Sequence, residues 1–333
     1  MGDIIQRFKD TPENLLALYG TMYRIRLFED MVAKKYGEGE IPGFCHTYQG
    51  EEPIAAGVCA ALAEGDVVFS THRGHGHAIA QGVSVNELMA ELYGKATGTN
   101  MGRGGSMHIY KKAAGFFGTN GLVGGGVGLA AGAAFELKYN KKPNVSVSFF
   151  GDGASNMGIF YETLNMASKW KLPVIFVCEN NRYATVTPLR KIAANTEIAS
   201  RGLAFRMENK CIDGNDATDV FEATAEARER AVAGEGPTLI EARTYRYMGH
   251  FVGDLLHGVY RTKEEMETRK YTGDALPAFR ARLAQVYKIE EAQIVAIEEK
   301  IIREIDEAVE FARSSPSPDP STAYDNLFVK ESF

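Results

Sequence analysis

The sequence predicts an α/β fold in which a parallel sheet carries helices on both faces. Apolar segments bounded by turn residues are predicted as buried strands at 144–150, 172–180 and 237–247. Helical patterns at 155–169 and 221–234 separate these strands along the chain. This alternation of strand and helix is typical of a parallel sheet that is covered on both sides.

Further helices are expected before and after this alternating region. Residues 11–37 suit a long helix, because Thr11 can cap its N-terminus and Pro12 fits its first turn. Shorter helices are predicted at 50–63, 83–94 and 129–139. The chain of 333 residues is expected to form one domain over 1–333, with a charged helical tail over 276–333.

Glycine is concentrated in one part of the chain. The sequence holds 35 glycines, and 13 of them lie between Gly94 and Gly132. They follow no three-residue period, so a collagen-like structure is excluded. The excess therefore indicates local backbone geometry, such as close approach of the main chain to a ligand.

Composition excludes several classes of protein. The net charge of −6 and the absence of a basic block speak against a nucleic-acid-binding protein. No apolar stretch is long enough to span a membrane, and the N-terminal MGDIIQRFKD resembles neither a signal nor a transit peptide, so we expect a cytoplasmic protein. The four cysteines are far apart, which argues against disulfides or a zinc site.

The most specific pattern is a Gly-Asp-Gly after one predicted strand and an Asn-Asn after the next. Asp152 and Asn181 would then lie at neighbouring strand ends, where open parallel sheets bind ligands. Carboxylate and amide oxygens suit Mg²⁺, which shares its coordination shell with phosphate oxygens. Gly153 and Ala154 open the following helix, whose free N–H groups favour an anion. The sequence therefore predicts a site for Mg²⁺ and a diphosphate.

This spacing resembles the thiamine diphosphate motif, and the rest of the chain agrees with that resemblance. Nearly the whole length resembles the α subunit of the heteromeric 2-oxo acid dehydrogenase E1 family. The segments that carry the resemblance include THRGHGHAIAQG, GRGGSMHIY, TNGLVGGGVGLAAG, TYRYMGH and VYRTKEE. The run His72-Arg73-Gly74-His75 is most similar to the acetoin dehydrogenase branch, since the pyruvate branch typically has Tyr-Arg-Ala-His there.

The resemblance implies how the cofactor would be held. Asp152, Asn181 and the backbone carbonyl of Tyr183 would bind Mg²⁺. Backbone groups of Gly153 and Ala154, with the Arg73 guanidinium, would contact the diphosphate. The remaining implied cofactor contacts are Gly121, Val123 and Arg261.

The resemblance also implies the catalytic side chains. His250 would handle protons near the reacting carbon, and Tyr260 with Arg261 would belong to a mobile loop, 249–261, at the mouth of the site. His72 and His75 are expected in the active-site wall. Phe251 stands where some relatives carry a regulatory serine, so phosphorylation at that position is not expected.

The implied reaction is shared between two subunits. Thiamine diphosphate would cleave acetoin to acetaldehyde and a bound two-carbon unit, which would pass to a lipoyl E2 acyltransferase. The glutamate that activates the cofactor would come from a separate E1 β subunit. We therefore expect an α₂β₂ tetramer that is active only when complete, within a multienzyme complex.

Four alternatives remain open. A pyruvate or branched-chain 2-oxo acid dehydrogenase α subunit would use the same chemistry. A non-catalytic scaffold would keep only the fold. The run from Gly126 to Ala131 fits a dinucleotide-binding fingerprint, although no clear strand precedes it. The spacing of His72, His75 and His77 also permits a zinc site.

Overall fold

The computed structural model describes residues 8, 11–254 and 260–325 of the chain. Its centre is a five-stranded parallel sheet in the order β1-β2-β3-β7-β6. The strands are β1 (Val67–Phe69), β2 (Ser146–Gly151), β3 (Val174–Asn180), β6 (Glu208–Asp213) and β7 (Thr238–Arg243). The predicted parallel α/β fold is confirmed.

Two strands of the sheet were not predicted, for different reasons. Strand β1 has only three residues. Strand β6 lies at the sheet edge and reads Glu-Asn-Lys-Cys-Ile-Asp, with side chains that are exposed or half-buried. An edge strand that faces water need not carry a run of apolar residues.

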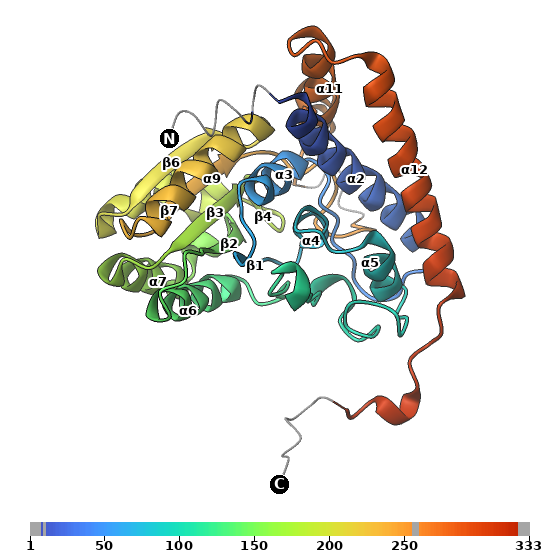
Figure 1. Cartoon of the computed structure of the whole chain (residues 1–333), viewed down its shortest axis with the longest axis horizontal. Helices are drawn as coiled ribbons and strands as arrows, with labels where there is room; N and C mark the ends of the chain where they lie inside the picture. The colour runs from blue at the N-terminus through green and yellow to red at the C-terminus, as the bar shows by residue number, and fades with distance from the viewer. Residues whose placement is uncertain (1–7, 9–10, 255–259, 326–333) are drawn as a thin grey trace.

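Helices cover both faces of the sheet, as Figure 1 shows. Helices α6 (Gly125–Tyr139) and α7 (Gly158–Trp170) lie side by side on one face, and α9 (Ala217–Val232) and α3 (Glu52–Ala60) lie on the other. Alternate residues of β3 follow this division. Val174 and Phe176 join the apolar cluster of α6 and α7, whereas Ile175 joins that of α3 and α9.

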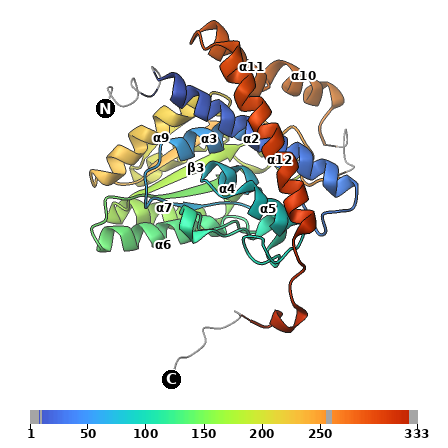
Figure 2. The same ribbon diagram turned by 45° about the vertical axis from the view of Figure 1, so that its right-hand side comes forward.

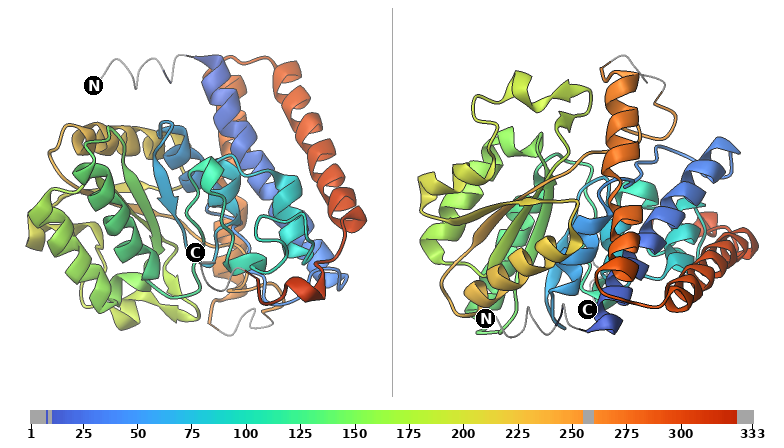
Figure 3. Two further views of the ribbon diagram at one scale, coloured as in Figure 1. Left: turned by 60° about the horizontal axis from the view of Figure 1, so that its bottom comes forward. Right: turned by 90° about the horizontal axis from the view of Figure 1, so that it is seen from above.

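A second layer of helices packs beside the sheet. Helix α2 (Pro12–Gly37) and helix α12 (Glu291–Ser314) run side by side, as Figures 2 and 3 show. Tyr19 donates a hydrogen bond to Glu298, and Arg24 pairs with Glu304 across this contact. The other helices of this layer are α4 (His75–Ala80), α5 (Val85–Leu92), α10 (Lys263–Gly273) and α11 (Ala275–Gln285).

Short elements complete the described structure. The hairpin strands β4 (Tyr183–Ala184) and β5 (Thr187–Pro188) and helix α8 (Leu189–Ile192) follow β3. The 3₁₀ turns are η1 (Gly105–Met107), η2 (Lys112–Ala114), η3 (Ala154–Asn156), η4 (Ala199–Phe205) and η5 (Pro320–Thr322). Among the described residues, no helix combines the length and apolar character needed to cross a membrane.

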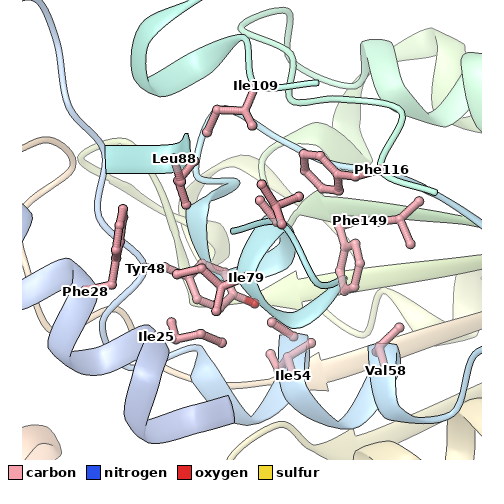
Figure 4. Close-up of a cluster of buried hydrophobic side chains, with 14 of the residues drawn as sticks. Ile25, Phe28, Tyr48, Ile54, Val58, Ile79, Leu88, Ile109, Phe116 and Phe149 are labelled. Atoms are coloured by element: carbon pink, nitrogen blue, oxygen red, sulfur yellow. The ribbon is translucent and has the colours of Figure 1, made fainter. Parts of the chain in front are cut away.

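The main core joins the sheet to the helical layer. Figure 4 shows Ile25 and Phe28 of α2, Ile54 and Val58 of α3, and Phe149 of β2 around Tyr48. All six side chains are almost completely buried. Loop residues 45–51, which contain Tyr48, are thus fixed between helices and sheet, at the edge where the predicted site lies.

Several predicted boundaries shift. The tail helix expected from residue 276 is two helices, α11 and α12, with a break that contains Lys288 in a left-handed conformation. Helix α6 begins at Gly125, four residues before the predicted start. Gly126 and Ala131 of the dinucleotide-like pattern therefore lie inside a helix rather than in a turn between strand and helix.

Candidate active site

A cavity of about 240 Å³ lies at the carboxyl ends of β2 and β3. Strand pairing sets Gly151 beside Glu179, so the residues that follow both strands meet at one edge. The cavity brings together ten of the predicted site residues: His72, Arg73, Gly121, Val123, Asp152, Gly153, Ala154, Asn181, Tyr183 and His250.

Asp152 has the properties of a metal ligand. Its side chain is 1% exposed, and its Oδ2 has no hydrogen-bond partner among the described residues. Burial raises the pKa of its carboxyl group to about 6. Asn181 lines the same cavity, and its Oδ1 accepts a hydrogen bond of 3.3 Å from the Tyr183 amide. An unpaired carboxylate oxygen beside an amide oxygen fits Mg²⁺, which prefers oxygen ligands.

Position 153 has no room for a side chain, so it requires glycine. A Cβ on Gly153 would lie 2.8 Å from the Cβ of Ala184 in the β4–β5 hairpin. Two non-glycine residues of this hairpin region, Arg182 and Thr185, have positive φ angles of 74° and 55°. Such conformations cost free energy and are often found at ligand sites. The hairpin thus lies close against the start of η3, where a diphosphate would contact the backbone.

Arg73 links two loops beneath the cavity. Its guanidinium donates to the carbonyl of Thr47 and, over 2.9 Å, to that of His250. Its Nε lies 3.9 Å from a carboxylate oxygen of Glu51. Burial lowers the pKa of Arg73 to about 10, and the nearby Arg246 acts in the same direction. Each terminal nitrogen has a second N–H, which leaves donors for an anion in the cavity.

Sequence patterns did not identify two buried acids in the wall. The amide of Asn181 donates to Glu51 over 3.1 Å, and burial together with Glu179 raises the pKa of Glu51 to about 8. Glu179 accepts hydrogen bonds from Tyr48 and, over 2.9 Å, pairs with His77 Nε2. The sequence feature that could have identified them was position, since Glu179 is the last residue but one of β3 and Glu51 directly precedes α3.

Three histidines from separate loops meet at one wall of the cavity. The ring centroids of His46 and His72 are 4.9 Å apart, those of His46 and His250 5.0 Å, and those of His72 and His250 5.4 Å. Burial, with Arg73 next in effect, lowers the pKa values of all three, to about 3, 2 and 4 for His46, His72 and His250. All three imidazoles are therefore neutral near pH 7.

The expectation that His75 lies in the active-site wall is wrong. Its side chain is completely buried and absent from the cavity lining. Its Nδ1 bonds Glu29 and its Nε2 bonds Ser106, each over 2.9 Å. His77 is likewise buried, with Ser70 and Glu179 on its two nitrogens. The residues His72, His75 and His77 thus do not converge on a zinc site.

Tyr260 and Arg261 do not line the cavity, and Arg261 instead contacts the backbone of the segment that leads to His250. Arg261 is buried and donates to the carbonyls of Arg246 and Met248, over 2.6 and 2.7 Å. It packs over the Tyr260 ring at 5.0 Å. In this arrangement its guanidinium holds backbone rather than a cofactor. Residues 255–259 of the predicted mobile loop lie outside the described part of the chain.

Arg246 is a wall residue that the sequence patterns did not identify. Its side chain is 2% exposed and donates to the carbonyls of Thr185 and Met248 and to the hydroxyl of Tyr260. A fourth contact, 3.5 Å long, reaches Nδ1 of His250. Arg246 therefore connects the β4–β5 hairpin to the segment that carries His250.

Comparisons with known proteins find similar chains. The chain matches the family described as the dehydrogenase E1 component over residues 20–321. It is 46% identical to the alpha subunit of acetoin:2,6-dichlorophenolindophenol oxidoreductase of Bacillus subtilis, over 96% of this chain and 95% of that protein. It is also 40% identical to the pyruvate dehydrogenase E1 component subunit alpha of Rhizobium meliloti, over 95% and 90%.

Proposed function

Because the chain belongs to the dehydrogenase E1 component family, we propose that it is the α subunit of a thiamine diphosphate-dependent E1 enzyme that cleaves acetoin. The observation that carries this proposal is the unpaired, buried carboxylate oxygen of Asp152 beside Asn181 in a cavity at the strand ends. That arrangement fits a magnesium diphosphate in the place where open α/β sheets bind ligands.

The chain's own residues would hold this cofactor in two parts. Asp152, Asn181 and the carbonyl of Tyr183 would bind Mg²⁺, while Gly153, Ala154 and Arg73 would contact the diphosphate. Gly121 and Val123, which also line the cavity, would place backbone groups against the thiamine ring. The chemistry that the cofactor supplies when bound is a carbon nucleophile for the substrate carbonyl.

His72 and His250 would transfer protons to and from the substrate beside that carbon. Neutral imidazoles can accept a proton from a hydroxyl group and return it later, which suits general acid–base catalysis. The backbone amide of His250 is held by Asp254 over 2.8 Å, and Arg246 donates to its Nδ1. In the neutral ring Nε2 then carries the hydrogen, so His250 would donate from Nε2, and His72 would be the proton acceptor. His75 and Arg261 act as positioning residues, since they hold Ser106 and Met248 rather than face the cavity.

Acetoin is favoured as substrate by the run His72-Arg73-Gly74-His75. His72 replaces the tyrosine expected in the pyruvate branch, and it lies against His46 and His250 in the cavity wall. The product aldehyde would leave as acetaldehyde, and the retained two-carbon unit would pass to a lipoyl E2. A 2-oxo acid is the competing substrate, because pyruvate dehydrogenase α subunits are also similar to this chain.

An apolar surface next to the cavity supports the need for a β subunit. Large apolar side chains on the outer sides of α6 and α7 are 39–78% exposed: Leu129, Phe135, Tyr139, Ile159, Met166 and Trp170. Leu122 and Val123 extend this surface to the cavity rim. Exposed apolar surface of this extent is typical of a protein interface. A β subunit here would close the cavity, as expected for an α₂β₂ tetramer.

Reconstitution tests the proposal. The purified chain, mixed with its β partner, Mg²⁺ and thiamine diphosphate, should reduce 2,6-dichlorophenolindophenol in the presence of acetoin, and neither subunit alone should do so. A 2-oxo acid series measures the competing specificity in the same assay. Turnover by the α chain alone, or a complex that binds no thiamine diphosphate by calorimetry, would refute the assignment.

A further inference from the structure

Glu91 is a buried acid that the proposed reaction does not use. It is the last residue but one of α5, and its side chain is completely buried. No basic side chain pairs with its carboxylate among the residues that the structure describes. A buried carboxylate is costly unless hydrogen bonds or a cation compensate for the lost water. The groups that compensate it therefore indicate which part of the fold depends on Glu91.

Four backbone N–H groups from a single loop, residues 98–107, donate to the carboxylate of Glu91. Oε2 accepts from Asn100 and Gly102 over 2.7 and 2.9 Å, and Oε1 accepts from Gly104 and Gly105 over 2.7 and 3.1 Å. Hydrogen bonds to a charged acceptor are about twice as strong as those between neutral groups. One side chain thus fixes the path of most of this loop.

The glycines of the loop leave room for this carboxylate. A Cβ on Gly98 would lie 2.5 Å from Oε2 of Glu91 and 2.6 Å from its Cα. Gly102 and Gly105 have positive φ angles of 74° and 57°, which glycine adopts at little cost. Part of the glycine excess seen in the sequence therefore accommodates the side chain of Glu91 rather than a ligand.

The loop ends at the wall of the cavity. Its last turn, η1, contains Ser106, whose Oγ accepts a hydrogen bond of 3.2 Å from the His46 N–H. The next residue, Met107, lines the cavity, as does His46. The position of this part of the wall therefore depends on the turn that the carboxylate of Glu91 holds.

We propose that Glu91 is a positioning residue for the reaction, because its carboxylate fixes the loop 98–107 and, through Ser106 and Met107, the cavity wall beside the substrate. The inference rests on the proposed function, since the position of the wall affects turnover only if the cavity is the active site. It assigns a role in catalysis to a residue that contacts neither substrate nor cofactor.

The test uses the complex of this chain with its β partner, Mg²⁺ and thiamine diphosphate. Glu91→Gln keeps the shape of the side chain but replaces one acceptor oxygen with a donor, so two of the four N–H groups lose their partner. Ser106→Ala cuts the connection to the wall and leaves Glu91 in place. Glu87→Gln is the matched control on the same helix, because Glu87 is 33% exposed and pairs with the similarly exposed Lys111.

Four quantities are measured for each variant and for the double variant. They are kcat and KM for acetoin, cofactor affinity by calorimetry, unfolding by urea, and deuterium exchange of the α chain by mass spectrometry. Exchange reports the loop directly and does not require turnover.

We expect kcat/KM for acetoin to fall about tenfold in Glu91→Gln and about fivefold in Ser106→Ala, since both loosen the wall. In the Ser106→Ala background, Glu91→Gln should cost at most about threefold, because the connection is already cut. Exchange should become faster in the loop 98–107 of Glu91→Gln and stay unchanged in β2. Cofactor affinity should stay within about threefold in every variant, because its proposed ligands lie on other elements. Glu87→Gln should match the wild type.

Wild-type kcat/KM in Glu91→Gln, together with faster exchange of the loop, would show that Glu91 stabilises the fold without affecting the reaction. Fully additive losses in the double variant would mean that Glu91 does not act through Ser106. If Glu91→Gln does not fold, an unchanged kcat/KM in Ser106→Ala or rapid exchange of the loop amides in the wild type would overturn the inference. A wild-type complex that binds no thiamine diphosphate would instead contradict the proposed function itself.

Discussion

The buried carboxylate of Asp152 is expected to destabilise the chain without a metal ion and to stabilise it when a metal ion is bound. Burial disfavours its charge, and one of its oxygens lacks a partner among the described residues. A divalent cation at that oxygen would reverse both effects, because it neutralises the carboxylate and takes up the lone pair. The free energy that the buried carboxylate costs the apo chain would thus be recovered when the metal binds.

Replacing Asp152 with asparagine should separate these two effects. The neutral amide has nearly the same shape, so the free energy of unfolding of the apo chain should stay the same or rise. The affinity of the αβ complex for magnesium thiamine diphosphate should fall by at least about tenfold, since a direct metal ligand is lost. Calorimetry and thermal unfolding measure the two quantities, with the exposed Asp306→Asn as control. Wild-type cofactor affinity in Asp152→Asn would remove Asp152 from the metal site.

The raised pKa of Glu51 predicts that the free energy of unfolding of the chain falls as the pH rises. Burial first, and the nearby Glu179 second, raise its pKa to about 8 in the folded chain. The native state therefore retains a proton that the unfolded state releases between about pH 4.5 and 8. The stabilisation from this proton is complete below about pH 4.5 and is lost as the pH rises through 8.

The variant Glu51→Gln should remove this contribution, because glutamine remains neutral throughout. Without cofactor, the wild-type chain should lose more unfolding free energy between pH 6 and 8 than Glu51→Gln does, by at most about 1.4 kcal/mol per pH unit. Urea unfolding at both pH values measures the difference. The exposed Glu64→Gln should behave like the wild type. Parallel slopes in wild type and Glu51→Gln would contradict the assigned cause.

At the scale of elements, helix α4 depends on the absence of a side chain at its N-cap. Gly74 has a φ of −97°, which any residue can adopt, so conformation does not require glycine. Space does, because a Cβ there would lie 2.0 Å from Cγ2 of Thr119 and 2.7 Å from Oγ of Ser70. Helix α4 begins directly after Gly74 with His75, so this contact sets the distance between the helix and the glycine-rich segment.

Gly74→Ala should therefore destabilise the chain by about 1–3 kcal/mol through overpacking. Thr119→Ser deletes Cγ2 but keeps the hydroxyl that accepts from the Ile109 amide over 2.7 Å. The double variant should recover part of the loss, and a double-mutant cycle from denaturant unfolding measures the coupling. Additive effects of the two substitutions would mean that Thr119 is not the obstacle.

Which elements the sequence predicts depends on how far each is buried. Strands β2, β3 and β7 have mostly buried residues and were found from their apolar runs. Edge strand β6 was missed because its polar residues face water. Helix α4 has six residues rich in histidine and glycine, and its pattern cannot be distinguished from a loop. Sequence patterns identify strands and helices that bury a continuous apolar face. Short or exposed elements are fixed by tertiary contacts, which the local sequence does not show.

At the scale of the whole molecule, the strand-end pattern predicted Asp152 and Asn181, and the family resemblance implied His72, Arg73 and His250, but neither identified His46, Glu51 or Arg246. Asp152 and Asn181 meet because parallel strands end at one edge, a consequence of topology alone. His46, Glu51 and Arg246 reach the cavity from distant segments, and their side-chain directions depend on contacts such as Ser106 with His46. His75 carried the same motif signal as His72, yet the turn of α4 directs it toward Glu29.

The whole molecule also presents a surface that its own helices leave exposed. Phe135 belongs to this surface, stacked on Tyr139 and 5.8 Å from Trp170 across the α6–α7 contact. Figure 1 shows these two helices on the side of the sheet away from α2 and α12. Since the same surface reaches the cavity rim at Val123, a partner bound there would complete the wall of the cavity.

Phe135→Asp should therefore weaken assembly with the β subunit without unfolding the α chain. An aromatic hot-spot residue contributes at least about 2 kcal/mol to an interface, so the dissociation constant should rise at least about thirtyfold. Sedimentation velocity and light scattering measure the assembly, and circular dichroism with thermal unfolding verifies the fold. Val286→Asp is the matched control, because Val286 is similarly exposed but follows α11, away from this surface. If Phe135→Asp assembled with wild-type affinity while retaining acetoin turnover, the β subunit would have to bind elsewhere, and the exposed face of α6 and α7 would need another partner.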